Sequence, residues 1–169
     1  MALILRKSLP EDIPAIMELI GEAQEYFRNK GIDQWQNGYP NPESIMNDIA
    51  LEHSFVLEKD TEVVATAMIS FDGEPTYDQI DGAWLTDQPY VVVHRVAVKT
   101  DLKGQNLAGE IFDCAEQMCR ERGISSFRVD THEENLSMQR VLAKRGFHYC
   151  GVITVSYGAA RMAFEKVLK

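Results

Sequence analysis

One continuous stretch, residues 91–122, limits what this chain can fold into. It begins with the apolar run VVVHRVAV, continues as the turn KTDLKGQNLAG and ends in the helical pattern EIFDCAEQMCRER. A buried strand, a glycine-containing turn and a long amphipathic helix in this order are typical of α/β folds. The first amides of a helix have no partner within the helix, and the helix dipole is positive there. The turn therefore predicts a site for an anion such as a phosphate group.

Composition bounds the domain organisation and the partners. The 169 residues are 45% hydrophobic and carry a formal net charge of −9, which predicts a single domain over residues 1–169. The acidic balance argues against a nucleic-acid partner and against an anionic membrane surface. No apolar run approaches the roughly 20 residues of a membrane span, and the N-terminus is too short for a signal peptide. Cys114, Cys119 and Cys150 are interpreted as free thiols, so we expect a cytoplasmic protein.

Hydrophobic periodicity predicts a mixed α/β fold (α+β mixed), with a central, mostly antiparallel sheet of about seven strands and about four helices. An antiparallel meander leads into a βαβ unit whose two strands should be parallel. The expected strands are 2–6, 55–59, 63–71, 90–98, 126–131, 147–154 and 161–167. The expected helices are 9–29, 42–51, 105–122 and 135–145. Ser8 and Glu11 have the spacing of a capping box for the first helix.

Two polar segments could carry recognition. The loop at residues 31–42 contains Trp35 and Tyr39, which either cover the core or form a wall of a substrate pocket. The segment 72–89 is long and polar, and such loops are usually functional or mobile. Seven acidic residues and no Lys or Arg lie between Asp60 and His94. This charge is either a solvated surface or a guide for a cationic substrate.

The element order, with VAVKTDLKGQNLAG in its middle and NLSMQRVLAKRGF after it, resembles the GCN5-related N-acetyltransferases (GNAT) over nearly the whole chain. The resemblance implies that the turn holds the pyrophosphate of acetyl-CoA and that strand backbone binds its pantetheine arm. The implied cofactor-binding residues are Val96, Ala97, Val98, Lys103, Gly104, Gln105, Asn106, Leu107, Ala108, Gly109 and Asn135.

The chain departs from the family pattern at four positions. Thr100 replaces a proline, Lys103 replaces an arginine or glutamine and keeps a positive charge, and Asn106 replaces a glycine. Asn tolerates the left-handed conformation better than other residues with a side chain, so we expect the turn to survive. Leu142 stands where many members have the Tyr that protonates the leaving thiolate. Either another group, such as Tyr149, Tyr157 or Cys150, supplies that proton, or the thiolate leaves with the help of solvent.

The implied activity is the transfer of an acetyl group from acetyl-CoA to a primary amine, either of a small molecule or of a peptide. The alternatives are a non-catalytic acyl-CoA sensor of the same fold, motivated by Leu142, and a homodimeric scaffold with a degenerate cleft. A homodimer is also compatible with the enzyme.

Acetyl transfer needs a base that deprotonates the amine. His94 is the first candidate, because it changes charge near neutral pH and lies in an otherwise apolar strand. On alternating positions, residues 92, 94, 96 and 98 share one face. Asp130 and His132 end the strand 126–131, where ligand sites of α/β folds lie, and would act together. Each of these three candidates also has a purely structural interpretation, as a hydrogen-bonded core side chain or as a surface charge. No spacing of His, Cys, Asp and Glu predicts a metal site.

Overall fold

The structure is a computed structural model that describes residues 3–102 and 104–169. The chain forms two compact units: residues up to Ile69 with Arg95–Cys114, and Ser70–His94 with Ala115–Lys169. One strand and one helix, β5 and α3, each begin in one unit and end in the other. The expectation of a single domain stays a prediction.

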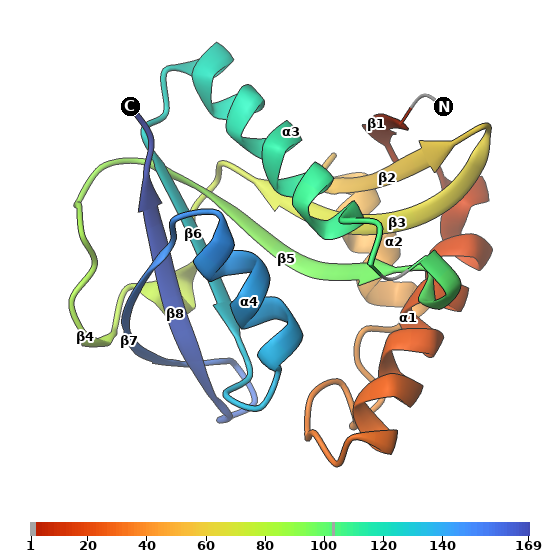
Figure 1. Cartoon of the computed structure of the whole chain (residues 1–169), viewed down its shortest axis with the longest axis horizontal. Helices are drawn as coiled ribbons and strands as arrows, with labels where there is room; N and C mark the ends of the chain where they lie inside the picture. The colour runs from red at the N-terminus through yellow and green to blue at the C-terminus, as the bar shows by residue number, and fades with distance from the viewer. Residues whose placement is uncertain (1–2, 103) are drawn as a thin grey trace. The chain divides into compact units, whose positions relative to one another are not determined.

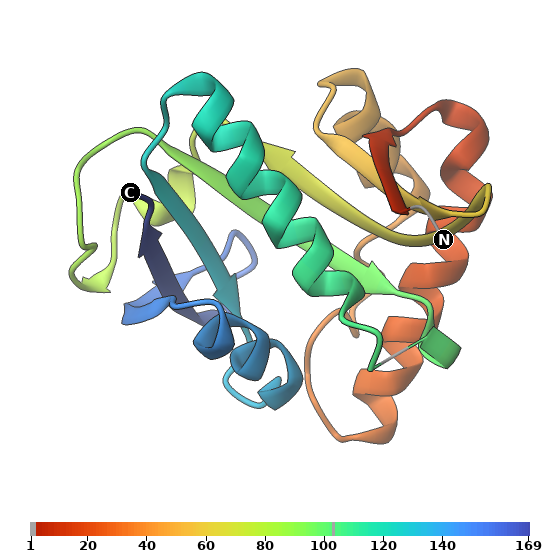
Figure 2. The same cartoon turned by 45° about the horizontal axis from the view of Figure 1, so that its top comes forward.

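The first unit is built on an antiparallel three-stranded meander. Register pairs such as Leu5 with Leu57 and Leu57 with Ala65 define its ladders, and Figures 1 and 2 show β2 and β3 as a long curved hairpin. Apolar side chains of two helices pack on this unit around the buried Ile16, Ile20 and Val56. The elements are β1 (Leu3–Lys7), η1 (Pro10–Asp12), α1 (Ile13–Asn29), α2 (Pro42–Ala50), β2 (Ser54–Lys59), β3 (Glu62–Ser70) and η3 (Thr100–Leu102).

The second unit has the strand order β5-β6-β8-β7-β4. The β5–β6 pair is parallel, as expected, and the recorded pairs of the other strands are antiparallel. The elements, including the two that both units share, are η2 (Pro75–Tyr77), β4 (Asp81–Gly82), β5 (Tyr90–Val98), α3 (Leu107–Arg122), β6 (Ser126–Thr131), α4 (Leu136–Lys144), β7 (His148–Thr154) and β8 (Ala160–Val167). The mixed, mostly antiparallel α/β fold is confirmed, with eight strands and four α-helices in the described residues.

One local expectation was wrong. The first helix is not capped by Ser8 and Glu11. Instead, the Asp12 carboxylate accepts a hydrogen bond of 2.7 Å from the Leu9 amide, and Ser8 accepts one from the Ser54 hydroxyl. The polar segment 72–89 contains only the short elements η2 and β4.

Strand β5 is irregular at Arg95, whose φ of +54° lies in the left-handed region. A left-handed residue interrupts the alternation of side chains, so residues 92–98 do not form one continuous face. The Arg95 guanidinium forms a two-point ion pair with Asp48 at 2.8 and 2.7 Å and also donates to the Tyr39 hydroxyl. Side chains of Arg95 and Asp48 are 15% and 6% exposed. This buried pair fixes a backbone conformation that is unfavourable for a residue with a side chain.

We predict that Asp48→Asn lowers the free energy of unfolding by about 3–5 kcal/mol, because it leaves a buried guanidinium without its carboxylate. Urea denaturation followed by circular dichroism measures the loss. The control is Glu52→Gln, which removes the exposed ion pair with Lys7 and should leave the midpoint nearly unchanged. Equal effects of the two substitutions would contradict the role given to Asp48.

Candidate active site

His94 lies between two carboxylates in the second unit. Its Nε2 is 2.8 Å from Oε1 of Glu74, and its Nδ1 is 3.4 Å from Oδ2 of Asp130. The side chains of His94, Glu74 and Asp130 are 16%, 21% and 11% exposed. Water screens charges poorly at such partly buried positions, so both carboxylates act strongly on the imidazole.

The two distances differ, and the difference indicates where the proton of a neutral His94 lies. The contact with Glu74 has a hydrogen-bond length, whereas the contact with Asp130 exceeds the usual range of about 2.7–3.2 Å. A neutral imidazole has one donor nitrogen and one acceptor nitrogen. We therefore assign the N–H to Nε2, where it donates to Glu74, and the lone pair to Nδ1. A proton taken up at Nδ1 would then be stabilised by Asp130.

Each carboxylate is itself held in place. The Tyr77 hydroxyl donates to Oδ2 of Asp130 at 2.6 Å. Tyr77 is fully buried, and burial together with the charge of Asp130 raises the pKa of its hydroxyl well above 10, so it remains a neutral donor. Glu74 accepts hydrogen bonds from the amide and hydroxyl of Thr76, and its own amide donates to the Tyr90 hydroxyl. Sequence reasoning missed Glu74 and Tyr77, because the polar segment 72–89 has no periodicity that ranks its residues.

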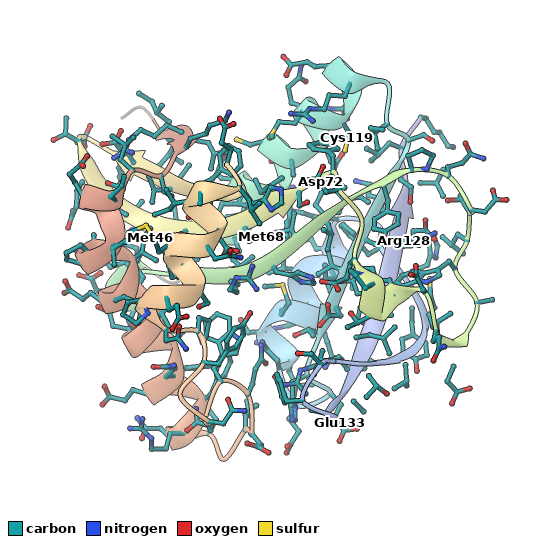
Figure 3. All side chains as sticks on the ribbon, turned by 180° about the vertical axis from the view of Figure 1, so that it is seen from behind. Met46, Met68, Asp72, Cys119, Arg128 and Glu133 are labelled. Atoms are coloured by element: carbon teal, nitrogen blue, oxygen red, sulfur yellow. The ribbon has the colours of Figure 1, made fainter. Side chains whose placement is uncertain are left out.

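The segment that carries Glu74 and Tyr77 is anchored by a buried ion pair. Glu165 is 0% exposed and accepts from Arg128 Nε at 3.2 Å, from the hydroxyls of Ser126 and Thr86, and from the amides of Leu85 and Thr86. Arg128, labelled in Figure 3, also donates to the Thr86 carbonyl.

Aromatic side chains connect this ion pair to the cluster. The Arg128 guanidinium lies 4.3 Å from the ring centroid of Trp84 and 4.2 Å from that of Tyr90. The Trp84 indole N–H donates to the Tyr77 carbonyl at 2.9 Å. Trp84 and Tyr90, which hold Tyr77 and the Glu74 backbone, are thus both packed on one buried guanidinium.

The turn before α3 has the backbone expected for it. Gly104 has φ +93° and Asn106 has φ +61°, so the structure confirms that Asn106 adopts the left-handed conformation. The Gln105 side chain accepts from Lys59 Nζ at 3.0 Å, and the Thr100 amide donates to Glu22 at 2.8 Å. Lys103 lies outside the described residues. The helix begins at Leu107, two residues later than expected, and Ala108 and Gly109 are in its first turn.

The other residues predicted to bind the cofactor lie in β5 and at the start of α4. Val96 and Val98 are half-buried in β5, and Ala97 is buried. Asn135 is the N-cap of α4, where its side-chain oxygen accepts from the Met138 amide at 3.2 Å. Leu142 is fully buried and has no proton to donate.

Asp130 and His132 are in different hydrogen bonds. His132 Nδ1 accepts from the Glu134 amide at 3.0 Å, whereas Asp130 contacts Tyr77 and His94. Trp35 packs on the core of the first unit and against Phe27, with 5.7 Å between ring centroids. Tyr39 accepts from Arg95.

The described part of the chain contains no group of three or more His, Cys, Asp or Glu that could hold a metal ion. None of its helices has the length and apolar composition needed to cross a membrane.

Comparisons with known proteins agree on one family. The model of the acetyltransferase (GNAT) family matches residues 16–147. The uncharacterized N-acetyltransferase YesJ of Bacillus subtilis (strain 168) is 24% identical over 152 residues, which cover 87% of this chain and 82% of YesJ. A crystal structure of a GNAT-family acetyltransferase from Streptococcus agalactiae 2603 is 33% identical, with a TM-score of 0.89, and the match covers 99% of this chain and 96% of that one.

The PaiA N-acetyltransferase from Thermoplasma acidophilum, solved in complex with coenzyme A, shares the fold at 15% identity. Its TM-score is 0.74, and the match covers 99% of both chains.

The hydrogen bond between His94 and Glu74 predicts a pH dependence of stability. The hydrogen bond from His94 lowers the pKa of Glu74 from 4.5 to about 2. The unfolded state therefore binds protons more readily than the folded state in this window. The stabilisation is fully present above pH 4.5 and is lost as the pH falls toward 2. We expect Glu74→Gln to be less stable than the wild type at pH 5, with a difference that shrinks at pH 4 and again at pH 3.

Urea unfolding at these three pH values measures the difference. Glu133, an exposed residue labelled in Figure 3, provides the control, since Glu133→Gln should follow the wild type at each pH. A Glu74→Gln difference that stays constant from pH 5 to pH 3 would contradict the lowered pKa of Glu74.

Proposed function

Because the chain belongs to the acetyltransferase (GNAT) family, we propose that it transfers the acetyl group of acetyl-CoA to a primary amine and that His94 is the base. Membership makes the chain an acyltransferase with acetyl-CoA as its co-substrate. The acceptor class and the roles of the residues go beyond family membership, and we propose them here. The single observation that carries it is the position of His94, with Nε2 bonded to Glu74 and Nδ1 beside Asp130.

The reaction needs the amine to lose one proton. The acceptor nitrogen forms a bond to the thioester carbonyl carbon, and the bond from that carbon to sulfur breaks. The proton lost by the nitrogen goes to Nδ1 of His94, and the resulting imidazolium is held between Glu74 and Asp130. Two fixed carboxylates stabilise this charge without reorganisation, which is how preorganised sites lower a barrier. His94 then returns the proton to solvent.

The leaving thiolate takes its proton from solvent. Leu142 cannot supply one, and the remaining candidates are poorly placed for the task. Tyr149 and Tyr157 are 56% and 48% exposed, and burial raises the pKa of the Cys150 thiol. In the described residues, none of the three forms a hydrogen bond with His94 or Asp130.

The turn at residues 103–109 and the backbone of Val96, Ala97 and Val98 are proposed to bind acetyl-CoA, together with Asn135. The left-handed Gly104 and Asn106 and the start of α3 at Leu107 support this role, because successive amides in such a turn face an anion. For the acceptor, Trp35 and Tyr39 stay candidates for the pocket wall.

We expect His94→Gln to lower kcat by about 10²–10⁴-fold, the usual contribution of a general base, with little change in the Kd of acetyl-CoA. Release of free thiol across an amine panel measures kcat, and calorimetry measures Kd. The matched control is His148→Gln, which changes an exposed His in β7 outside the cluster and should stay within a few-fold of wild type. If His94→Gln slows turnover less than tenfold, the base is another group.

Gly104→Glu tests the turn. The substitution places a side chain at a φ that only glycine adopts easily and adds a negative charge beside the proposed pyrophosphate. We expect acetyl-CoA affinity to fall at least tenfold. Gly158→Glu is the control, because Gly158 also has a positive φ of +88° with open space around it but lies in the β7–β8 turn. Unchanged affinity in Gly104→Glu would place the pyrophosphate elsewhere.

A further inference from the structure

Arg161, at the start of β8, is a buried cation without a carboxylate partner. It is 6% exposed, as buried as Arg128. Its guanidinium donates to the Tyr157 hydroxyl and to the Ala160 carbonyl, both at 2.9 Å. In residues 3–102 and 104–169, no ion pair involves Arg161. By contrast, Arg128 is paired with Glu165 and Arg95 with Asp48.

A buried charge without a counter-charge is unfavourable for folding. A guanidinium has five N–H donors, and the described residues provide acceptors for two of those on Arg161. The other donors keep their capacity to bind an anion. The planar arrangement of these donors matches the two oxygens of a carboxylate. The missing partner of Arg161 is therefore best supplied by the carboxylate of a ligand.

Arg161 lies on the face of the sheet that carries the His94 cluster. In the β6–β8 ladder, Arg128 pairs with Glu165 and Asp130 pairs with Ala163. Paired residues project to the same side, and Arg161 precedes Ala163 by two positions in β8, so it projects to that side as well. Two residues of strand correspond to about 7 Å. The face thus presents two carboxylates, Glu74 and Asp130, and at short range a guanidinium.

We propose that Arg161 binds the carboxylate of the acceptor, so that the acceptor is an amine of the amino-acid type. Its ammonium group is attracted by Asp130 and Glu74, loses one proton to solvent to become the neutral amine and gives a second proton to His94 during acetyl transfer, while its carboxylate binds Arg161. This inference rests on the proposed function, because His94 defines where the amine lies. The acidic segment 72–89 alone favours only a cationic acceptor. Arg161 implies that this acceptor also carries an anionic group.

The test uses amino acids and their carboxamides as matched pairs, which differ only in the carboxylate. With wild type, we expect kcat/KM for the amino acid to exceed that for its carboxamide at least tenfold. Arg161→Met should abolish this preference through a higher KM for the amino acid, with kcat and the affinity for coenzyme A unchanged. Calorimetric binding of the N-acetylated amino acid and its carboxamide, with coenzyme A present, gives the same comparison without turnover.

Stability separates ligand binding from a structural role. Arg161→Met removes a charge that no carboxylate compensates, so its unfolding midpoint should equal or exceed that of wild type. Arg128→Met is the matched control, because it leaves Glu165 buried and unpaired and should unfold far more easily. The inference is overturned if Arg161→Met is destabilised as strongly as Arg128→Met, or if wild type and Arg161→Met treat acid and carboxamide alike. If acid and carboxamide are used equally well but turnover of the carboxamide still requires His94, this inference fails and the proposed function stands.

Discussion

The arrangement of the second unit depends on the burial of Glu165. No solvent reaches this carboxylate, and five donors surround it. Two of them are amides of a segment that otherwise has little regular structure, so the ion pair with Arg128 ties that segment to the sheet. A buried pair of this kind contributes little net stability compared with apolar packing, but losing one partner is strongly destabilising. The effect of the Arg128–Glu165 ion pair is to hold residues 74–86 in one position on the sheet.

That fixed position makes the cluster around His94 chemically useful. An imidazole with one carboxylate has a defined tautomer, and a second carboxylate stabilises the cation that forms when a proton arrives. Tyr77 holds the second carboxylate, and the buried hydroxyl cannot ionise near neutral pH. Arg161 adds the opposite charge on the same face. The face is therefore dipolar, which suits an acceptor that carries both an ammonium and a carboxylate group.

Sequence periodicity predicted the elements and the parallel β5–β6 pair, because apolar spacing reports burial directly. The resemblance to the family turn led us to expect that Asn106 could replace a glycine there, because Asn tolerates the left-handed conformation, and its φ of +61° agrees. Sequence periodicity could not place Glu74 and Tyr77, which contact residues 20 and 53 positions away through a segment that is ordered by tertiary contacts. Nor could it distinguish Arg161 from the other arginines, because the absence of a counter-charge is a property of the folded chain. The helix cap was wrong for a similar reason, since Asp12 bonds to Arg6 as well as to the Leu9 amide.

The central claim is that His94 holds its proton on Nε2, toward Glu74, and offers Nδ1 as the base. Nitrogen-15 correlation spectroscopy of the four histidines, with His94 assigned by substitution, measures the tautomer of the neutral ring. The account predicts a protonated Nε2 and an unprotonated Nδ1, and a loss of this preference in Glu74→Gln. A neutral His94 that is protonated on Nδ1, with Nε2 free, would contradict it.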